Sequence, residues 1–164
     1  MYPTASVANE FLELGEVEGI PISPMKLQKL VFFAHGWNLA LYDRPLVNEQ
    51  VECWEYGPVF RTLYRLVKRY GAEAITGRIE SGGREPRLPL DTGEETRSLI
   101  RTVWDCYKQL SAIKLSNMTH IPDSPWSRRR QQYGDRGLEV PIGTDIPEDW
   151  IRDYYRKLGQ QVSA

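Results

Sequence analysis

This 164-residue sequence has little cysteine, little histidine and no long hydrophobic run. The two cysteines, Cys53 and Cys106, are far apart and form no CxxC motif, so we expect reduced thiols. With two histidines in all, we expect no structural zinc site and no metal. The longest apolar run, residues 30–34, is too short to cross a bilayer, and residues 1–20 resemble no secretory signal. We therefore expect a soluble cytoplasmic protein that makes no membrane contact.

An excess of charge of one sign is also missing. The 21 Lys and Arg residues are balanced by 22 Asp and Glu residues, which gives a formal net charge of -1. This balance argues against a protein that binds nucleic acid through bulk electrostatics. Hydrophobic residues make up 41% of the chain, too many for a disordered protein. The length fits a single domain over residues 1–164.

The dominant pattern in the sequence is helical. Ser23 and Pro24 form a strong helix start, and an apolar stripe with one polar member, Asn38, follows at helical spacing to about Tyr42. Other stripes predict helices over about 4–18, 57–70, 92–110, 111–118, 124–134 and 147–158. Residues 47–55 favour a short strand or an extended segment, and residues 135–147 a surface loop. We predict a mainly α fold of six or seven helices with at most a small β patch.

Several residues are predicted to begin or end these helices. Serines and threonines at N-caps accept backbone hydrogen bonds, and proline is favoured at the first helical position. Gly71 is expected to end its helix in the left-handed conformation. The predicted starts are Thr4 or Ser6, Gly57 with Pro58, Thr92 with Glu95 as a capping box, Ser111, and Ser124 with Pro125.

Sequence motifs for catalysis are absent: there is no GxSxG, Walker, GxGxxG or HExxH pattern. His35 is expected to be a buried histidine with one hydrogen bond. His120 is either a helix C-terminal histidine or, with Asp123 three residues later, an oriented imidazole in a hydrolase or nuclease. The first interpretation is favoured because no nucleophile with a known signature accompanies it. We predict no catalytic residue and no cofactor.

The arginines Arg128, Arg129 and Arg130 form a short basic cluster close to Trp126 and Tyr133. Such a cluster supports either nucleic-acid binding, including repression of the protein's own operon, or a solvated face paired with Asp123 and Asp135. Consecutive helical residues point about 100° apart, so only part of the triplet can face one surface.

Aromatic residues are abundant, with five Trp and nine Tyr. Trp37, Trp104 and Trp150 fall on helical stripes and are expected in the core. Trp54, Tyr56 and Trp126 lie beside turns instead, where they either line the core or anchor a partner protein.

Three stretches together resemble the Panacea domain, the SocA-like (also GepA-like) phage-associated family. They are residues 23–37 (SPMKLQKLVFFAHGW), 53–59 (CWEYGPV), and 115–120 (LSNMTH) with 124–126 (SPW). The resemblance covers about residues 20–130. It implies a mainly α, non-enzymatic antitoxin that binds a cognate toxin protein. It also implies that some members act as adaptors that deliver the toxin to an ATP-dependent protease.

We assign candidate roles within these motifs. Lys26 and Lys29 are three residues apart, so both are expected on the polar face of their helix. The candidate partner-binding residues are Lys26, Lys29, Trp54, Tyr56, His120, Trp126 and Arg129. The candidate structural residues are Leu27, Gln28, Leu30, Gly57, Pro58, Thr119 and Pro125.

Overall fold

The computed structural model describes residues 1–162. Its elements in chain order are α1 (Thr4–Glu18), α2 (Pro24–Tyr42), β1 (Glu52–Trp54), β2 (Gly57–Val59), α3 (Arg61–Val67) with a 3-10 turn η1 (Lys68–Tyr70), α4 (Glu94–Tyr107), α5 (Ala112–Thr119), α6 (Pro125–Gly134) and α7 (Glu148–Val162). The described residues thus contain seven α-helices and one two-stranded sheet, which confirms the predicted mainly α fold.

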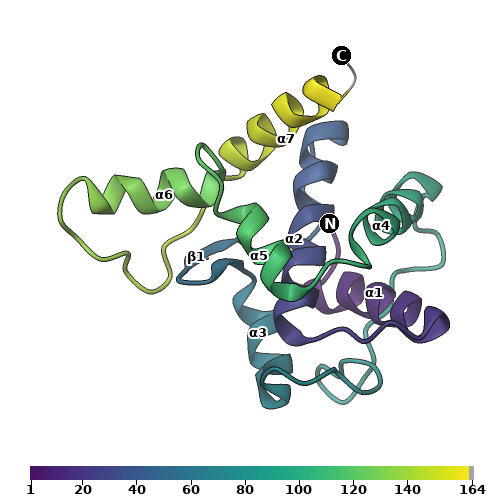
Figure 1. The fold of residues 1–164 in the computed structure, drawn as a ribbon. Helices are drawn as coiled ribbons and strands as arrows, with labels where there is room; N and C mark the ends of the chain where they lie inside the picture. The colour runs from purple at the N-terminus through teal and green to yellow at the C-terminus, as the bar shows by residue number, and fades with distance from the viewer. Residues whose placement is uncertain (163–164) are drawn as a thin grey trace.

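Helix α2 forms the centre of the fold, and every other helix except α6 packs against it (Figure 1). Its apolar residues Leu27, Leu30 and Val31 have no exposed surface. The sequence predicted that only one stripe of this helix faces the core. That prediction is too narrow, because Lys29 and His35 are buried as well, at 1% and 0% exposed. A helix surrounded on all sides cannot keep a polar face, so its polar side chains must find partners inside the protein.

Three predicted helix starts are confirmed in atomic detail. The Ser23 hydroxyl accepts a hydrogen bond from the backbone N–H of Lys26, and Pro24 occupies the first turn of α2. Ser111 caps α5 and Ser124 caps α6 in the same way, each three residues ahead of its donor.

Two other predicted starts are wrong. Helix α1 is preceded by Pro3 instead of a capping side chain, because the hydroxyl of Thr4 donates to Glu49. Helix α4 begins after Gly93, and Thr92 makes no hydrogen bond there. The partner expected in that capping box, Glu95, pairs with an arginine from the α2–β1 connection. Tertiary contacts therefore replaced local caps at both positions.

Gly57 and Pro58 belong to a strand and do not start a helix, which corrects a further prediction. Strand β2 pairs antiparallel with β1, with Trp54 opposite Gly57. Helix α3 begins at Arg61, after the N-cap residue Phe60, whose C=O accepts the first helical hydrogen bond from Tyr64 N–H. The side chain of Gln28 bonds to both the N–H and the C=O of Phe60. Helix α2 thus holds the hairpin in place.

The ends of two helices also differ from the prediction. Gly71 has φ 57° and ψ −118°, which is not the left-handed helical conformation. The last helix extends to Val162, beyond the expected end near Leu158. It packs closely on α2, where a side-chain carbon on Gly36 would overlap the ring of Tyr155.

Helix α6 and the loop over residues 135–147 form an arm that projects from the body of the protein (Figure 1). The end of this loop returns to β1: the N–H of Cys53 donates to Thr144 O at 2.8 Å, and Ile146 N–H donates to Val51 O at 2.7 Å. These bonds place the predicted surface loop directly beside the hairpin.

Candidate partner-binding site

The three sequence motifs meet at one point around Gly57. The ammonium group of Lys29 on α2 donates to the carbonyl oxygen of Pro58 at 3.1 Å. A Cβ on Gly57 would lie 2.6 Å from Lys29 Nζ and 2.8 Å from the hydroxyl of Thr119 at the end of α5. Gly57 also has φ +108°, a value that other residues rarely adopt. This junction of α2, hairpin and α5 has room only for glycine.

Lys26 and Lys29 do not lie on an exposed face, which corrects their predicted placement. Lys26 is 7% exposed and donates to the carbonyl oxygen of Lys108. Burial lowers the pKa of Lys29 to about 7 and also lowers the pKa of Lys26. Within residues 1–162, neither forms an ion pair. Both side chains donate hydrogen bonds to backbone carbonyl groups of neighbouring segments. These bonds attach α2 to those segments, which favours a structural role for both lysines.

Trp126 connects the hairpin to α6. Its indole Nε1–H donates to the carbonyl oxygen of Trp54 at 2.7 Å. Its ring stacks on the imidazole of His120, with the ring centroids 3.9 Å apart and 19° between the planes. The thiol of Cys53 lies 3.9 Å from the carbonyl oxygen of Trp126. Trp126 is half-buried, and its contacts with Trp54 and Cys53 fix the position of the hairpin.

His120 lies at the C-terminal end of α5, as one of the two interpretations predicted. Burial lowers its pKa, and the positive charges of Lys29 and Arg130 lower it further. No hydrogen bond or ion pair between His120 and Asp123 is present in the described part of the chain. The described residues also contain no group of three His, Cys, Asp or Glu side chains that could hold a metal. The geometry offers no support for the hydrolase interpretation.

The hydrogen bond expected for His35 is not formed. Neither ring nitrogen has a hydrogen-bond partner, and Nε2 lies 4.0 Å from a carboxylate oxygen of Glu148. The ring lies edge-on to Phe60. Burial lowers the pKa of His35 to about 4, so the imidazole is neutral near pH 7.

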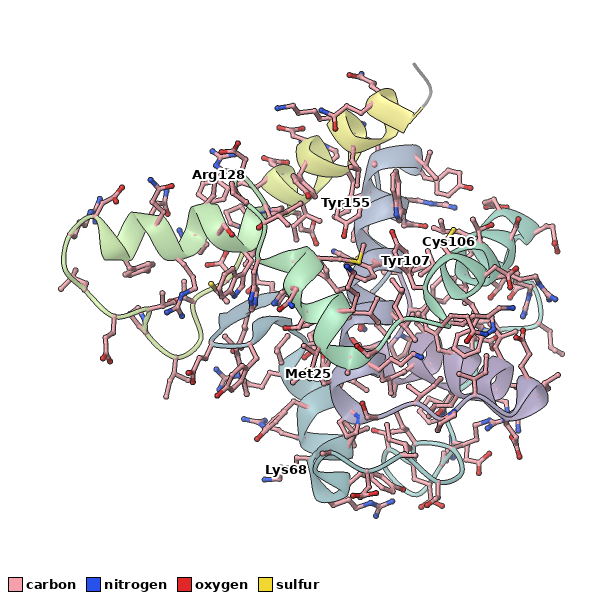
Figure 2. All side chains as sticks on the ribbon, viewed as in Figure 1. Met25, Lys68, Cys106, Tyr107, Arg128 and Tyr155 are labelled. Atoms are coloured by element: carbon pink, nitrogen blue, oxygen red, sulfur yellow. The ribbon has the colours of Figure 1, made fainter. Side chains whose placement is uncertain are left out.

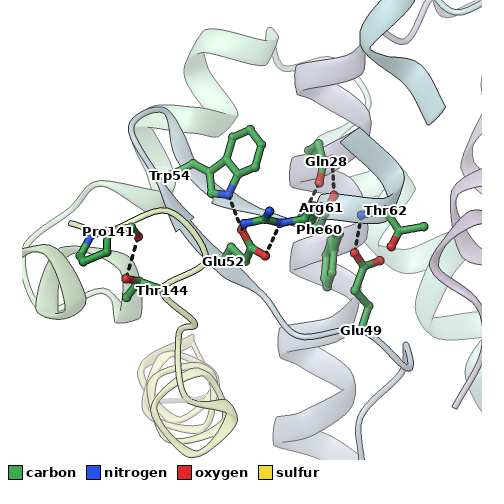
Figure 3. A network of polar contacts seen from close by, with 9 residues as sticks. All are labelled: Gln28, Glu49, Glu52, Trp54, Phe60, Arg61, Thr62, Pro141 and Thr144. Atoms are coloured by element: carbon green, nitrogen blue, oxygen red, sulfur yellow. Dashed lines mark hydrogen bonds and ion pairs between the residues drawn. The ribbon is translucent and has the colours of Figure 1, made fainter. Parts of the chain in front are cut away.

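The turn between the two strands presents Tyr56 to solvent, with 64% of its side chain exposed. Its backbone carbonyl oxygen accepts a hydrogen bond from Ser116 on α5 at 2.9 Å, which fixes the turn. The neighbouring Trp54 is half-buried, and its indole N–H donates to Glu52, which also binds Arg61 (Figure 3). The structure thus places these two predicted anchors side by side on a rigid hairpin.

The arginine triplet is divided among three environments. Arg128, labelled on α6 in Figure 2, is exposed, and its guanidinium stacks on Trp150 of α7, 4.0 Å from the ring centroid. Arg129 pairs with Asp145 at 3.2 Å, so the expected partners Asp123 and Asp135 are wrong. Arg130 lies over the ring of Trp126, 5.3 Å from its centroid, and forms no ion pair with any residue in 1–162. The helical geometry separates them as predicted.

The outer side of the hairpin and the arm enclose a groove of about 770 Å³. Leu138 and Ile142 of the arm loop line it with 57% and 90% of their side chains exposed. The sequence predicted this surface loop but gave it no role in a site, although its alternating apolar residues Leu138, Val140 and Ile142 were a detectable signal. The groove is lined by Cys53, Trp54, Glu55, Arg130, Gly134, Leu138, Glu139, Val140, Pro141 and Ile142.

The acidic residues of α1 are paired instead of forming a charged patch. Glu13 and Glu16 lie near Arg78, and Glu18 binds Lys108 at 2.8 Å. These pairings offset the acidic charges of α1.

Comparison with known proteins identifies the family. Residues 27–127 match the family described as "Antitoxin SocA-like, Panacea domain". The chain belongs to this family. It is 32% identical over 167 residues to "Antitoxin SocA" of Caulobacter vibrioides (strain NA1000 / CB15N), covering 97% of this chain and 85% of that protein. No solved structure matches it. No helix in residues 1–162 is long and apolar enough to span a membrane.

Proposed function

We propose that this protein is a non-enzymatic antitoxin that neutralises a cognate toxin by direct protein–protein binding. Membership of the antitoxin SocA-like family supports the antitoxin role. The observation that carries the binding mechanism is the rigid hairpin with Tyr56 at its tip. An exposed tyrosine on a fixed backbone is a typical anchor, because little entropy is lost when it is covered.

The binding surface combines the hairpin tip with the adjoining groove. Of the predicted partner-binding residues, Trp54 and Tyr56 reach this surface directly. Arg129 is half-buried and paired with Asp145, and Trp126 supports the hairpin through its hydrogen bond to the carbonyl oxygen of Trp54. We propose that Lys29 and His120 act indirectly, by holding the hairpin in the binding conformation through Pro58 and Trp126, and that Lys26 fixes α2 to the α4–α5 connection.

Binding neutralises the toxin either by covering its active surface or by delivering it to an ATP-dependent protease. The two modes differ in the lifetime of the toxin. Under occlusion, the toxin accumulates as a stable complex; under delivery, its half-life shortens when the antitoxin is present and lengthens when the protease is removed. A pulse-chase measurement of the toxin in cells separates these outcomes.

Nucleic-acid binding through the arginine triplet is a second candidate function, which rests on exposed Arg128. It has less support, because Arg129 is already paired with Asp145 and the net charge is -1. A binding assay with the protein's own promoter at moderate salt tests it, and a salt-dependent complex weakened by Arg128→Ala is the supporting result.

The main proposal is tested by co-expression with the product of the adjacent open reading frame. We expect that product alone to stop growth, and this protein to restore growth and to co-purify with it. If growth is not restored and the two proteins do not co-purify, the proposal is wrong.

A further inference from the structure

We propose that the groove between the hairpin and the arm binds an extended apolar segment of the partner protein, and that Arg130 pairs with an aspartate or glutamate side chain of that segment. This inference rests on the proposed function, which it deepens by naming what the partner presents. Three independent features of the groove carry it: its apolar wall, its free backbone groups and its unpaired cation.

The apolar wall indicates that the segment carries hydrophobic side chains. Ile142 is 90% exposed and Leu138 57% exposed, and both line the groove together with Trp54 of the hairpin. Exposing this much apolar surface costs free energy, at about 25 cal/mol per Å², which is recovered when a partner covers it. No other segment within residues 1–162 covers these side chains.

The backbone of the loop indicates that the segment is extended. Glu139 and Val140 belong to no helix or strand, and neither forms a backbone hydrogen bond with any other described residue. The turn that follows is held in place, because the hydroxyl of Thr144 donates to the carbonyl oxygen of Pro141 at 2.7 Å (Figure 3). An extended chain laid along 139–140 satisfies the open donors and acceptors, as in strand addition.

The charges indicate an acidic residue in the segment. Arg130 is half-buried and lacks an ion-pair partner among the described residues, whereas its neighbour Arg129 pairs with Asp145. The groove also contains Glu55 and Glu139, but both are exposed and water screens their charges. A carboxylate of the partner gains the most binding free energy at the half-buried guanidinium of Arg130. This group lies over the indole ring of Trp126 and offers the carboxylate two parallel N–H donors.

The inference is tested by measuring the affinity of three variants for the product of the adjacent open reading frame. We expect Arg130→Ala and Ile142→Asp each to weaken binding at least about tenfold. The matched control is Arg128→Ala, which removes an exposed arginine from the same helix outside the groove and is expected to change affinity by less than about twofold. Unchanged thermal unfolding of each variant shows that the fold is retained.

A charge reversal then tests the acidic residue itself. Hydrogen exchange on the complex identifies the partner segment that becomes protected together with residues 138–142. We expect Arg130→Glu to abolish binding and a Lys in place of the acidic residue of that segment to restore it. Extending the partner's C-terminus should leave affinity unchanged; if it blocks binding, the carboxylate is the chain terminus and the proposal is wrong.

The outcomes separate this inference from the proposed function. If the wild-type protein binds its partner and the groove variants bind equally well, the groove assignment is wrong and the antitoxin proposal stands. If the wild-type protein does not bind, both are wrong. If Arg130→Ala abolishes binding of a single-stranded oligonucleotide and leaves the protein complex intact, the groove serves nucleic acid and the inference is overturned.

Discussion

The ammonium group of Lys29 and the carbonyl oxygen of Pro58 are joined by a 3.1 Å hydrogen bond inside the protein, at the point where α2 meets the hairpin. Lys29 is 1% exposed, and no carboxylate pairs with it in the described residues. A buried cation without a counter-charge costs stability unless its proton is lost, so this contact makes the stability of the fold depend on pH.

Stability should increase as pH rises through the range in which folded and unfolded Lys29 differ in protonation. Burial lowers the pKa of Lys29 from 10.5 to about 7, so between these values the unfolded chain binds more protons than the folded one. The free energy of unfolding therefore rises with pH in this window. We expect Lys29→Met to remove most of the rise.

The measurement is urea unfolding at a series of pH values from about 6 to about 8.5, below the range in which tyrosines and the unfolded Cys53 thiol ionise. Lys114→Met, which changes an exposed lysine on α5, is the matched control and should keep the wild-type slope. An identical slope in Lys29→Met would show that the lysine is not the cause.

Replacing Gln28 with Leu should destabilise the protein by about 2 kcal/mol or more. The Gln28 amide bonds to both the N–H and the C=O of Phe60, each at 3.0 Å, and both groups are buried. Leucine has a similar size but leaves the buried Phe60 N–H unsatisfied and removes one of the two hydrogen bonds to the Phe60 C=O, which also accepts from Tyr64 N–H. Chemical unfolding measures the loss, and Gln131→Leu on the exposed side of α6 should stay within about 0.5 kcal/mol of wild type.

Replacing Gly36 with Ala should cost about 1–3 kcal/mol, because the new methyl group overlaps the buried ring of Tyr155 and forces α7 away from α2. Gly134→Ala, also in a helix, has nothing within 4 Å of the added carbon and should be neutral or slightly stabilising. Thermal unfolding of both variants provides the comparison. Equal stability of the two would contradict the close packing of α7.

Replacing Tyr56 with Ala should weaken toxin binding by at least about tenfold without lowering the unfolding temperature. The side chain is largely exposed at the hairpin tip, so its loss removes contact area from a partner and little from the core. Tyr42→Ala, at the partly exposed end of α2, is the control and should bind normally. Titration calorimetry measures both, and equal affinities would show that the tip is not an anchor.

Local signals in the sequence predicted much of the fold. Ser23, Ser111 and Ser124 cap the helices that follow them, because a serine hydroxyl and the N–H three residues later meet without help from the rest of the chain. The prediction was wrong at Gly57 and Pro58, where the contacts that decide the structure come from α2, 29 and 32 residues earlier in the sequence. Such long-range contacts leave no local pattern.

Only the part of the candidate site that depends on local sequence patterns could be predicted. Trp54 and Tyr56 stand beside a turn, a pattern that left core packing and an exposed anchor open, and the structure half-buries Trp54 and exposes Tyr56. The burial of Lys26 and Lys29 did not follow, since spacing alone placed them on a polar face and only the helices around α2 remove that face. The groove depends on a loop that returns from residue 144 to residue 53, which helical periodicity does not describe.

The return of that loop to β1 also covers the outer edge of the hairpin. Without the bonds from Cys53 to Thr144 and from Ile146 to Val51, the outer side of the hairpin would be a bare strand edge, a ready template for pairing with another copy. A proteolytic cut within residues 135–143 would loosen this cover while the rest of the core stayed folded. Nicked molecules should therefore be the first to aggregate on storage.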